Sequence, residues 1–217
     1  MAGKALFLDR DGVVNVDGGY VHRIEDFRLV PGILNLCRQA KEKGYLVLVA
    51  TNQSGIGRGM FSEDDFERLT EYMRGVFRSS GAEIAGVFHC PSADDGHPDR
   101  KPNPGLFLKA AAAHGLDMKA CVSVGDRERD IRAALAAGVG RNFLFSAEDV
   151  PTLATARVET LEEVAARLEG GDSCLGKIAA VCPWSYPLHR CGRHGTGAGQ
   201  SILTYGGEPV RSGTIRP

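Results

Sequence analysis

The chain has 217 residues, of which 43% are hydrophobic and 24% are charged, so it can bury a core of its own. Its 26 basic and 27 acidic residues give a net charge of −1, which excludes the broad basic surface of a nucleic-acid-binding domain. No apolar run approaches the roughly 18 residues needed to cross a bilayer. The N-terminus shows no secretory signal and the six cysteines are too few for a disulfide scaffold, so we expect a cytoplasmic protein.

Short apolar runs alternate with segments of helical periodicity along the chain. The runs that predict strands lie at residues 5–8, 45–50, 84–88, 120–124 and 142–145. The patterns that predict helices lie at residues 32–43, from residue 62 to about residue 76, and at 105–114, 130–137 and 159–168. Strands that alternate with helices form βαβ units, so we expect an α/β fold with a mostly parallel sheet flanked by helices.

The composition and periodicity of the sequence change at Gly170 and Gly171, which follow the last helical pattern. The segment beyond them holds the only tryptophan and shows no persistent period. We therefore expect one domain over residues 1–170 and a C-terminal extension over 171–217 that is irregular or partly disordered. A zinc-binding interaction module in the extension is the weaker interpretation, because its Cys/His spacing matches no zinc pattern with a known mechanism. The residues concerned are Cys182, His189, Cys191 and His194.

Polar residues follow several of the predicted strands. The first strand ends in Asp9-Arg10-Asp11-Gly12 and the second in Thr51-Asn52-Gln53-Ser54. A later strand ends in Gly125-Asp126, with Asp130 four residues on, and a loop carries Arg100-Lys101-Pro102. Each segment alone is also typical of a turn or a helix cap. Together they bring acids, a hydroxyl, an amide and a lysine to the edge of a parallel sheet where ligands bind, which favours a functional site.

These residue types suit phosphoryl transfer. A carboxylate can attack phosphorus and form an aspartyl-phosphate, and a second acid can protonate the leaving alkoxide and later deprotonate water. The transferred group is negatively charged, so Mg²⁺, a lysine and neutral donors around its oxygens stabilise it. Carboxylates are the hard oxygen ligands that Mg²⁺ prefers.

The same segments resemble the four motifs of the haloacid dehalogenase superfamily phosphatases. Residues 8–15 are similar to the first motif, 51–54 to the second, 100–102 to the third, and 124–126 with Asp130 to the fourth, in the family's order over residues 4–168. Within the superfamily the chain resembles the D-glycero-D-manno-heptose 1,7-bisphosphate 7-phosphatases and, next, the histidinol-phosphate phosphatases. The segment Asp-Gly-Gly-Tyr-Val-His at residues 17–22 favours the heptose branch.

The resemblance implies a Rossmann-like fold without a large cap domain. It also implies Mg²⁺-dependent hydrolysis of a phosphomonoester through an aspartyl-phosphate. The substrate it favours is D-glycero-D-manno-heptose 1,7-bisphosphate, cleaved at C7, in the synthesis of nucleotide-activated heptose for lipopolysaccharide, capsule or other glycans.

The resemblance further implies a role for each matching residue. Asp9 is the expected nucleophile and a Mg²⁺ ligand, Asp11 is the general acid/base whose backbone carbonyl meets the metal, and Asp126 is the third ligand. Thr51 and Lys101 are expected to hold the phosphoryl oxygens. The residues expected to line the substrate site are Asp17, Gly18, Gly19, Tyr20, Thr51, Asn52, Gln53, Ser54, Arg100, Lys101 and Arg127, with Arg100 on the phosphate that is not cleaved.

One loop departs from the family pattern. Heptose phosphatases usually carry a zinc loop of the form Cys-x-His, a short spacer and Cys-x-Cys, whereas this chain has Cys90, Ser92, His97 and Asp99 at those positions. Structural zinc sites nearly always close with four Cys or His ligands. We therefore expect a metal-free loop held by hydrogen bonds and proline; Cys90, His97 and Asp99 would be the ligands if zinc bound.

Two alternatives stay open. A histidinol-phosphate or broader sugar phosphatase would use the same catalytic residues, and a panel of substrates separates it. A sugar-phosphate-binding protein without catalysis is the alternative from another class, and the intact pair of Asp9 and Asp11 argues against it. We expect a small phosphorylated sugar as the substrate, no nucleic-acid or membrane partner, and a monomer.

Overall fold

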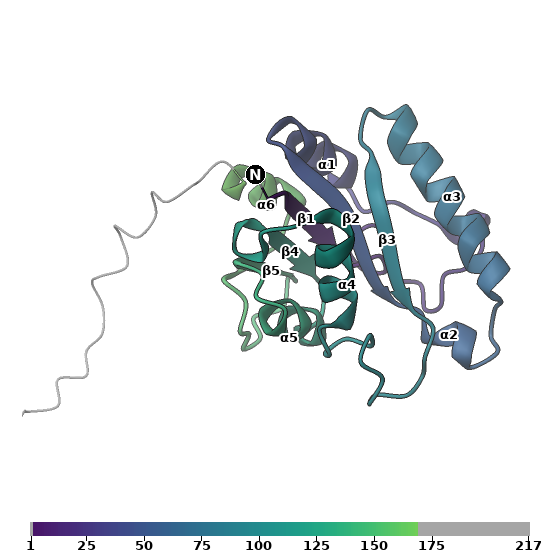
Figure 1. The fold of residues 1–217 in the computed structure, drawn as a ribbon. Helices are drawn as coiled ribbons and strands as arrows, with labels where there is room; N and C mark the ends of the chain where they lie inside the picture. Colours follow the sequence, from purple (N-terminus) through teal and green to yellow (C-terminus); the bar gives the residue numbers. More distant parts are fainter. Residues whose placement is uncertain (1, 169–217) are drawn as a thin grey trace, which may run out of the picture. The chain divides into compact units, whose positions relative to one another are not determined.

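The computed structural model describes residues 2–168 of the chain (Figure 1). These residues fold around a six-stranded sheet in the order β3-β2-β1-β4-β5-β6, in which all neighbouring strands run parallel. The strands are β1 (Lys4–Leu8), β2 (Tyr45–Asn52), β3 (Ile84–Cys90), β4 (Val122–Gly125), β5 (Arg141–Phe145) and β6 (Ala156–Val158). The α-helices are α1 (Ile33–Glu42), α2 (Ser54–Gly57), α3 (Glu63–Ser79), α4 (Gly105–His114), α5 (Glu128–Ala136) and α6 (Leu161–Arg167). Two short 3₁₀ helices are η1 (Ile24–Asp26) and η2 (Met118–Ala120).

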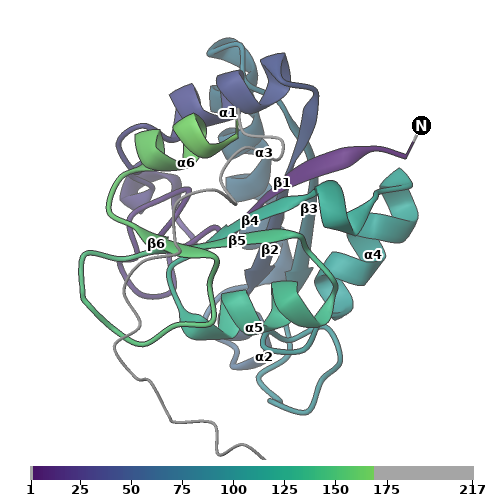
Figure 2. The ribbon, with the colours of Figure 1, turned by 90° about the vertical axis from the view of Figure 1, so that its left-hand side faces the viewer.

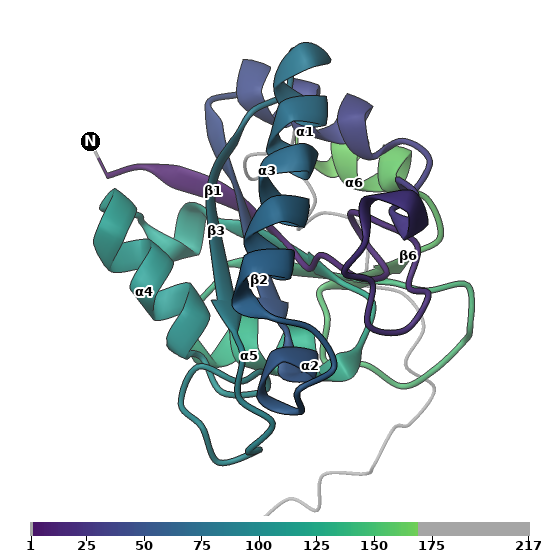
Figure 3. The ribbon, with the colours of Figure 1, turned by 90° about the vertical axis from the view of Figure 1, so that its right-hand side faces the viewer.

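Helices cover both faces of the sheet, and in Figure 2 α1 and α6 lie above it while α5 lies below it. Side chains along a strand alternate between the two faces, so β1 contributes to both cores. Leu6 and Leu8 are buried with the apolar faces of α1, α3 and α6. Ala5 and Phe7 are buried with those of α4 and α5. Figure 3 shows the long helix α3 beside the sheet, on which it contacts β3.

Helix α3 begins where the sequence predicts because its first turn is capped. The Ser62 hydroxyl accepts the backbone N–H of Asp65 at 3.1 Å, and the Asp65 carboxylate accepts the N–H of Ser62 at 3.0 Å. This reciprocal pair satisfies two backbone donors that the helix itself cannot bond. The helix then buries Leu69, Met73 and Phe77, which recur at its period.

The predicted α/β fold with helices on both sides of the sheet is confirmed, and the sheet is fully parallel rather than mostly so. The five predicted strands and five predicted helices all exist, with ends that differ by a few residues. Residue 120 ends the 3₁₀ helix η2, so the strand predicted from there begins at Val122. The short elements β6 and α2 were not predicted.

Within residues 2–168, none of the helices has the length and apolar character needed to cross a membrane. The predicted extension over residues 171–217, with its Cys/His group, lies outside the described residues. The domain boundary at 170, the monomeric state and the cytoplasmic location stay predictions.

Candidate active site

Residues predicted for catalysis, phosphoryl binding and metal binding gather at the carboxyl ends of three neighbouring strands. Asp9 follows β1 directly, Thr51 lies near the end of β2 and Asp126 follows β4. These ends are adjacent because β1 lies between β2 and β4. Lys101 reaches them from the loop between β3 and α4. Asp9, Thr51 and Lys101 are at most 6% exposed, so the centre of the site is shielded from bulk water.

The ammonium group of Lys101 lies among carboxylates. Its Nζ lies 2.9 Å from Asp9 Oδ1 and 2.7 Å from Asp130 Oδ1, and it donates to the carbonyl oxygen of Ala50 at 2.8 Å. The Asn52 amide fixes the lysine backbone through two 3.0 Å hydrogen bonds, one to its carbonyl oxygen and one from its N–H. Burial alone would lower the pKa of Lys101, but Asp130 and Asp9 raise it above its ordinary value, so the group stays charged.

The carboxyl group of Asp9 has a strongly perturbed pKa. Burial raises it from 3.8 to about 7; Lys101 opposes this rise, and the nearby carboxylates of Asp130 and Asp126 add to it. Burial also raises the pKa of Asp126. Asp9 and Asp130 therefore share the charge of one lysine, and Asp126, which is paired with Arg127, adds a third carboxylate beside them. A cation at this point would stabilise the ionised form of Asp9, which is the form able to act as a nucleophile.

The same three carboxylates, those of Asp9, Asp126 and Asp130, lie within 4.8 Å of one another. Asp130 is already engaged, because its Oδ1 pairs with Lys101 and its Oδ2 accepts the N–H of Arg127 at 3.0 Å. The Oδ1 of Asp126 is buried and has no hydrogen-bond partner in the described part of the chain. A buried carboxylate oxygen without a donor, beside Asp9, fits a hard divalent cation, so Asp9 and Asp126 are suited to hold Mg²⁺.

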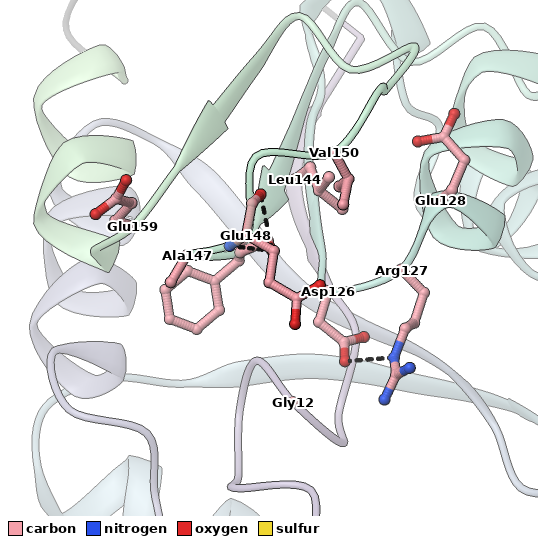
Figure 4. Close-up of a pocket in the computed structure, with 11 residues that line it drawn as sticks. Gly12, Asp126, Arg127, Glu128, Leu144, Ala147, Glu148, Val150 and Glu159 are labelled. Carbon is pink, nitrogen blue, oxygen red and sulfur yellow. Dashed lines mark hydrogen bonds and ion pairs between the residues drawn. The ribbon is translucent and has the colours of Figure 1, made fainter.

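Gly12 allows the loop after β1 to pass close to Asp126. Its φ of +93° lies in the left-handed region, and a Cβ at this position would stand 2.4 Å from Asp126 Oδ2. Figure 4 shows the Gly12 loop next to the side chains of Asp126 and Arg127, while Glu128 is turned away from them. A larger residue at position 12 would thus displace one of the two carboxylates suited to the metal.

The side chain of Asp11 is held by donors on several sides. Arg10 contacts both of its oxygens, with Nη2 at 3.0 and 2.8 Å and Nε at 3.3 Å from Oδ1. Asn15 donates to Oδ1 at 3.0 Å and Gln53 donates to Oδ2 at 3.0 Å. The Nη2 of Arg10 also donates to the carbonyl oxygen of Val21, at 2.6 Å. These bonds fix the position of the Asp11 side chain.

The hydroxyl of Thr51 is oriented by Gln53, whose Nε2 donates to Thr51 Oγ1 at 2.8 Å. Because this oxygen accepts a bond, its own hydrogen can donate to a ligand oxygen. The amide nitrogen of Gln53 uses its two hydrogens on Thr51 and Asp11. Gln53 therefore acts on the site through these two residues, and Asn52 acts on it through Lys101.

A cavity of about 210 Å³ opens on these residues. Its lining comes from the loop after β1, the end of β2 and the start of α2, the loop before α4, and the first turn of α5. The lining residues are Asp9, Asp11, Asp17, Gly19, Tyr20, Thr51, Asn52, Gln53, Ser54, Arg100 and Arg129. Most of the residues predicted to bind substrate are therefore brought together.

Three predicted residues lie elsewhere around this cavity. Gly18 lines a neighbouring cavity of about 360 Å³, together with Gly19 and Tyr20. Lys101 does not line the cavity but contacts Asp9, which does. Arg127 lines a third cavity of about 610 Å³, shown in Figure 4.

Both arginines predicted to bind substrate already have partners. The Nε of Arg100 donates to Asp95 Oδ1 at 2.9 Å, and its Nη1 donates to the carbonyl oxygen of Ser92 at 3.2 Å. The Nε of Arg127 donates to Asp126 Oδ2 at 3.1 Å, and its Nη2 lies 3.5 Å from Asp17 Oδ2. Arg100 thus braces the loop before α4 while it lines the cavity.

Comparison with known proteins identifies the family. The family model described as haloacid dehalogenase-like hydrolase matches residues 2–138 of this chain. The chain belongs to the haloacid dehalogenase-like hydrolases. The resemblance inferred from the four motifs is confirmed.

Curated relatives of this haloacid dehalogenase-like hydrolase carry closely related names. It is 49% identical over 168 residues to D-glycero-alpha-D-manno-heptose-1,7-bisphosphate 7-phosphatase of Burkholderia mallei, which covers 72% of this chain and 87% of the relative. It is 45% identical over 148 residues to D-glycero-beta-D-manno-heptose-1,7-bisphosphate 7-phosphatase of Yersinia pestis, covering 64% of this chain and 79% of the relative.

A similar solved structure is that of D,D-heptose 1.7-bisphosphate phosphatase from B. bronchiseptica, complexed with magnesium and phosphate. It has a TM-score of 0.69 and 32% identity, and the match covers 76% of this chain and 97% of that one. The structure of a putative haloacid dehalogenase-like phosphatase from Mesorhizobium loti has a TM-score of 0.68 and 30% identity, covering 77% and 87% of the two chains.

The loop from Cys90 to Asp99, in which the zinc pattern expected of heptose phosphatases is incomplete, is closed by direct contacts. Cys90 Sγ lies 3.5 Å from His97 Nδ1, and the N–H of Asp99 donates to the same nitrogen at 3.2 Å. The Asp99 carboxylate forms an ion pair with Lys109. Among residues 2–168, the group of three possible metal ligands that converges is the aspartate cluster, and the Cys90 loop does not form another.

Four residues of the site were given no role by the sequence. Arg10, Asn15 and Asp130 lie within the motif segments, but nothing in their spacing shows that they contact Asp11 or Lys101. Arg129 occupies an exposed position on α5. From the sequence alone, an arginine at such a position is expected to be a solvated helix residue. Only the folded chain shows that it lines the cavity.

Proposed function

We propose that this haloacid dehalogenase-like hydrolase removes the C7 phosphate of D-glycero-D-manno-heptose 1,7-bisphosphate by a Mg²⁺-dependent aspartyl-phosphate mechanism. The observation that carries the proposal is the buried group of Asp9, Lys101 and Asp130 beside the unpartnered oxygen of Asp126. It lies under a small polar cavity in a chain 49% identical to a heptose bisphosphate phosphatase.

In the first step an oxygen of Asp9 attacks the phosphorus of the C7 phosphate. The bond between phosphorus and the sugar oxygen breaks, and Asp11 gives that oxygen its proton, so the sugar leaves as an alcohol. The hydroxyl of Thr51, which lines the same cavity as Asp9, and the ammonium of Lys101, 2.9 Å from Asp9, are donors that can stabilise the phosphoryl oxygens. Ionised Asp11 and phosphorylated Asp9 remain.

In the second step Asp11 takes a proton from a water molecule, and the water oxygen attacks the phosphorus of the aspartyl-phosphate. The bond to the Asp9 oxygen breaks, which regenerates the carboxylate and releases inorganic phosphate. Asp11 ends the cycle protonated, as it began. The hydrogen bonds from Arg10, Asn15 and Gln53 support this assignment, because they keep Asp11 within reach of the same reacting group in both steps.

Asp9 and Asp126 are the side chains that would hold Mg²⁺, with the backbone carbonyl of Asp11 as a further ligand. Bound there, the cation would neutralise charge on the transferring phosphoryl group and keep Asp9 ionised. The proposed Mg²⁺ site is supported by the excess of carboxylates over cations around Asp9 and by the buried Oδ1 of Asp126.

We also propose that the loop beginning at Cys90 works without a structural zinc. The direct contact of Cys90 with His97 and the pairing of Asp99 with Lys109 support this proposal, because they use the groups that a zinc ion would need. Elemental analysis of the purified protein should find less than about 0.1 zinc per chain. One tightly held zinc that Cys90→Ser removes would contradict it.

Steady-state phosphate release from a panel of substrates tests the function. The panel holds both anomers of heptose 1,7-bisphosphate, histidinol phosphate and a hexose 6-phosphate, each with Mg²⁺, and the Asp9→Asn variant is the control. One heptose bisphosphate anomer should have a kcat/KM at least about 100-fold above that of the other classes. Equal turnover of histidinol phosphate would support a broader phosphatase, and binding without turnover would support a sugar-phosphate-binding protein.

A further inference from the structure

Arg129 stands apart from the other cations around the cavity. It lies in the first turn of α5 and lines the 210 Å³ cavity together with Asp9, Asp11 and Arg100. Arg100 reaches the cavity from the loop before α4, so two guanidinium groups on different elements border the same small space.

The other cations near the cavity are already neutralised. Arg10 and Lys101 are buried against carboxylates, Arg100 is bonded to Asp95, and Arg127 is bonded to Asp126. Among residues 2–168, the side chain of Arg129 makes no hydrogen bond or ion pair. It therefore offers its full set of N–H donors at the cavity, and no carboxylate has to be displaced before a ligand binds.

We infer that Arg129 is a specificity-determining residue that binds the phosphate that is not cleaved. The inference rests on the proposed function, in which the C7 phosphate lies at Asp9 and a second phosphate remains on the sugar. A guanidinium group matches two phosphate oxygens at once, and such a charge-assisted pair is stronger than a neutral hydrogen bond. Since Arg100 gives its Nε to Asp95 and its Nη1 to Ser92, it has less to offer the second phosphate than Arg129 has.

The alternative is that Arg129 is only a solvated helix residue, and the chain provides a matched control for it. Arg132 lies one turn further along α5, is similarly exposed, pairs with Glu128 at 4.0 Å, and does not line the cavity. Arg129→Ala and Arg132→Ala therefore remove the same charge from the same helix, one at the cavity and one away from it.

The experiment compares kcat/KM for heptose 1,7-bisphosphate and for heptose 7-phosphate, which lacks the second phosphate. Arg129→Ala should lower the value for the bisphosphate by about 10- to 100-fold, mainly through KM, and change that for the monophosphate by less than about twofold. Arg129→Lys should fall between, because lysine keeps the charge and loses the two-point geometry. Arg132→Ala should leave both values unchanged.

Product inhibition gives an independent readout. Arg129→Ala should raise the inhibition constant of heptose 1-phosphate about tenfold or more and leave that of inorganic phosphate unchanged. An equal loss on both substrates, or no loss on either, would overturn the role of Arg129. If the wild-type enzyme cleaves neither heptose phosphate, the proposed function fails, and that result is visible before any variant is measured.

Discussion

Replacing Arg10 with methionine should both loosen Asp11, the proposed general acid/base, and weaken the fold. The Arg10 side chain is 1% exposed, contacts both oxygens of Asp11 and donates to the carbonyl oxygen of Val21 at 2.6 Å. A hydrogen bond to a charged group contributes about 1.5–3 kcal/mol. The Asp11 side chain is 21% exposed, so water can replace part of what is lost. We expect the free energy of unfolding to fall by about 3 kcal/mol.

A double-mutant cycle isolates the pair from the packing of the arginine. Urea unfolding of the wild type, Arg10→Met, Asp11→Asn and the double variant should give a coupling energy of about 2 kcal/mol. Arg10→Lys keeps the charge but lacks the two-point geometry of the guanidinium group, so it should recover less than half of the lost free energy of unfolding. A coupling energy below about 0.5 kcal/mol would show that Arg10 does not hold Asp11, whatever the stability of the single variants.

Three further predictions concern the aspartates and the loop beside them. Asp11→Asn should slow hydrolysis of a sugar phosphate by about 10²–10⁴-fold but that of an aryl phosphate by less than about tenfold, because an aryl oxide leaves without protonation; equal losses would contradict its role as acid. In metal-free protein the pKa of Asp9 is raised from 3.8 to about 7, so the folded state binds the proton more tightly and stability falls as pH rises toward 7. Asp9→Asn lacks this titrating group. In EDTA, the free energy of unfolding of Asp9→Asn should therefore rise by about 2 kcal/mol relative to that of the wild type between about pH 5 and about pH 7. A difference between the two proteins that does not change with pH would refute the raised pKa of Asp9. Gly12→Ala places a Cβ 2.4 Å from Asp126 Oδ2, so the Mg²⁺ concentration for half-maximal activity should rise about tenfold or more; an unchanged Mg²⁺ titration would exclude Asp126 as a ligand.

The fold could be predicted largely from the sequence because its strands are buried on both faces. Such strands appear as short continuous apolar runs, as β1 and β2 do. The edge strand β6 has only three residues with Arg157 in the middle, so it leaves no such run. Helix α2 has four residues, of which two are glycine, and no helical period can show over so short a length.

The sequence predicts the residues of the site mainly where they follow the end of a strand. Asp9, Thr51 and Asp126 follow from the rule that ligands bind at the carboxyl ends of parallel strands. The contacts of Lys101 with Asp9 and of Asn52 with Lys101 join residues 92 and 49 positions apart, which no local pattern encodes.

Arg100 shows the same limit. From the sequence, Arg100 is expected to bind the phosphate that is not cleaved. In the structure it lines the cavity and is paired with Asp95, whose side chain is 93% exposed. The structure shows the contacts that hold the loop, while phosphate binding by Arg100 stays a prediction, and the pairing with Asp95 favours Arg129 at the second phosphate.

The ³¹P NMR spectrum of heptose 1,7-bisphosphate during turnover tests the central claim most directly. The substrate has two phosphomonoester signals, one from C1 and one from C7. With the enzyme and Mg²⁺, the C7 signal should disappear as inorganic phosphate grows in, while the C1 signal persists, and Asp9→Asn should leave both signals intact. Loss of the C1 signal, or no release of phosphate by the wild-type enzyme, would contradict the account.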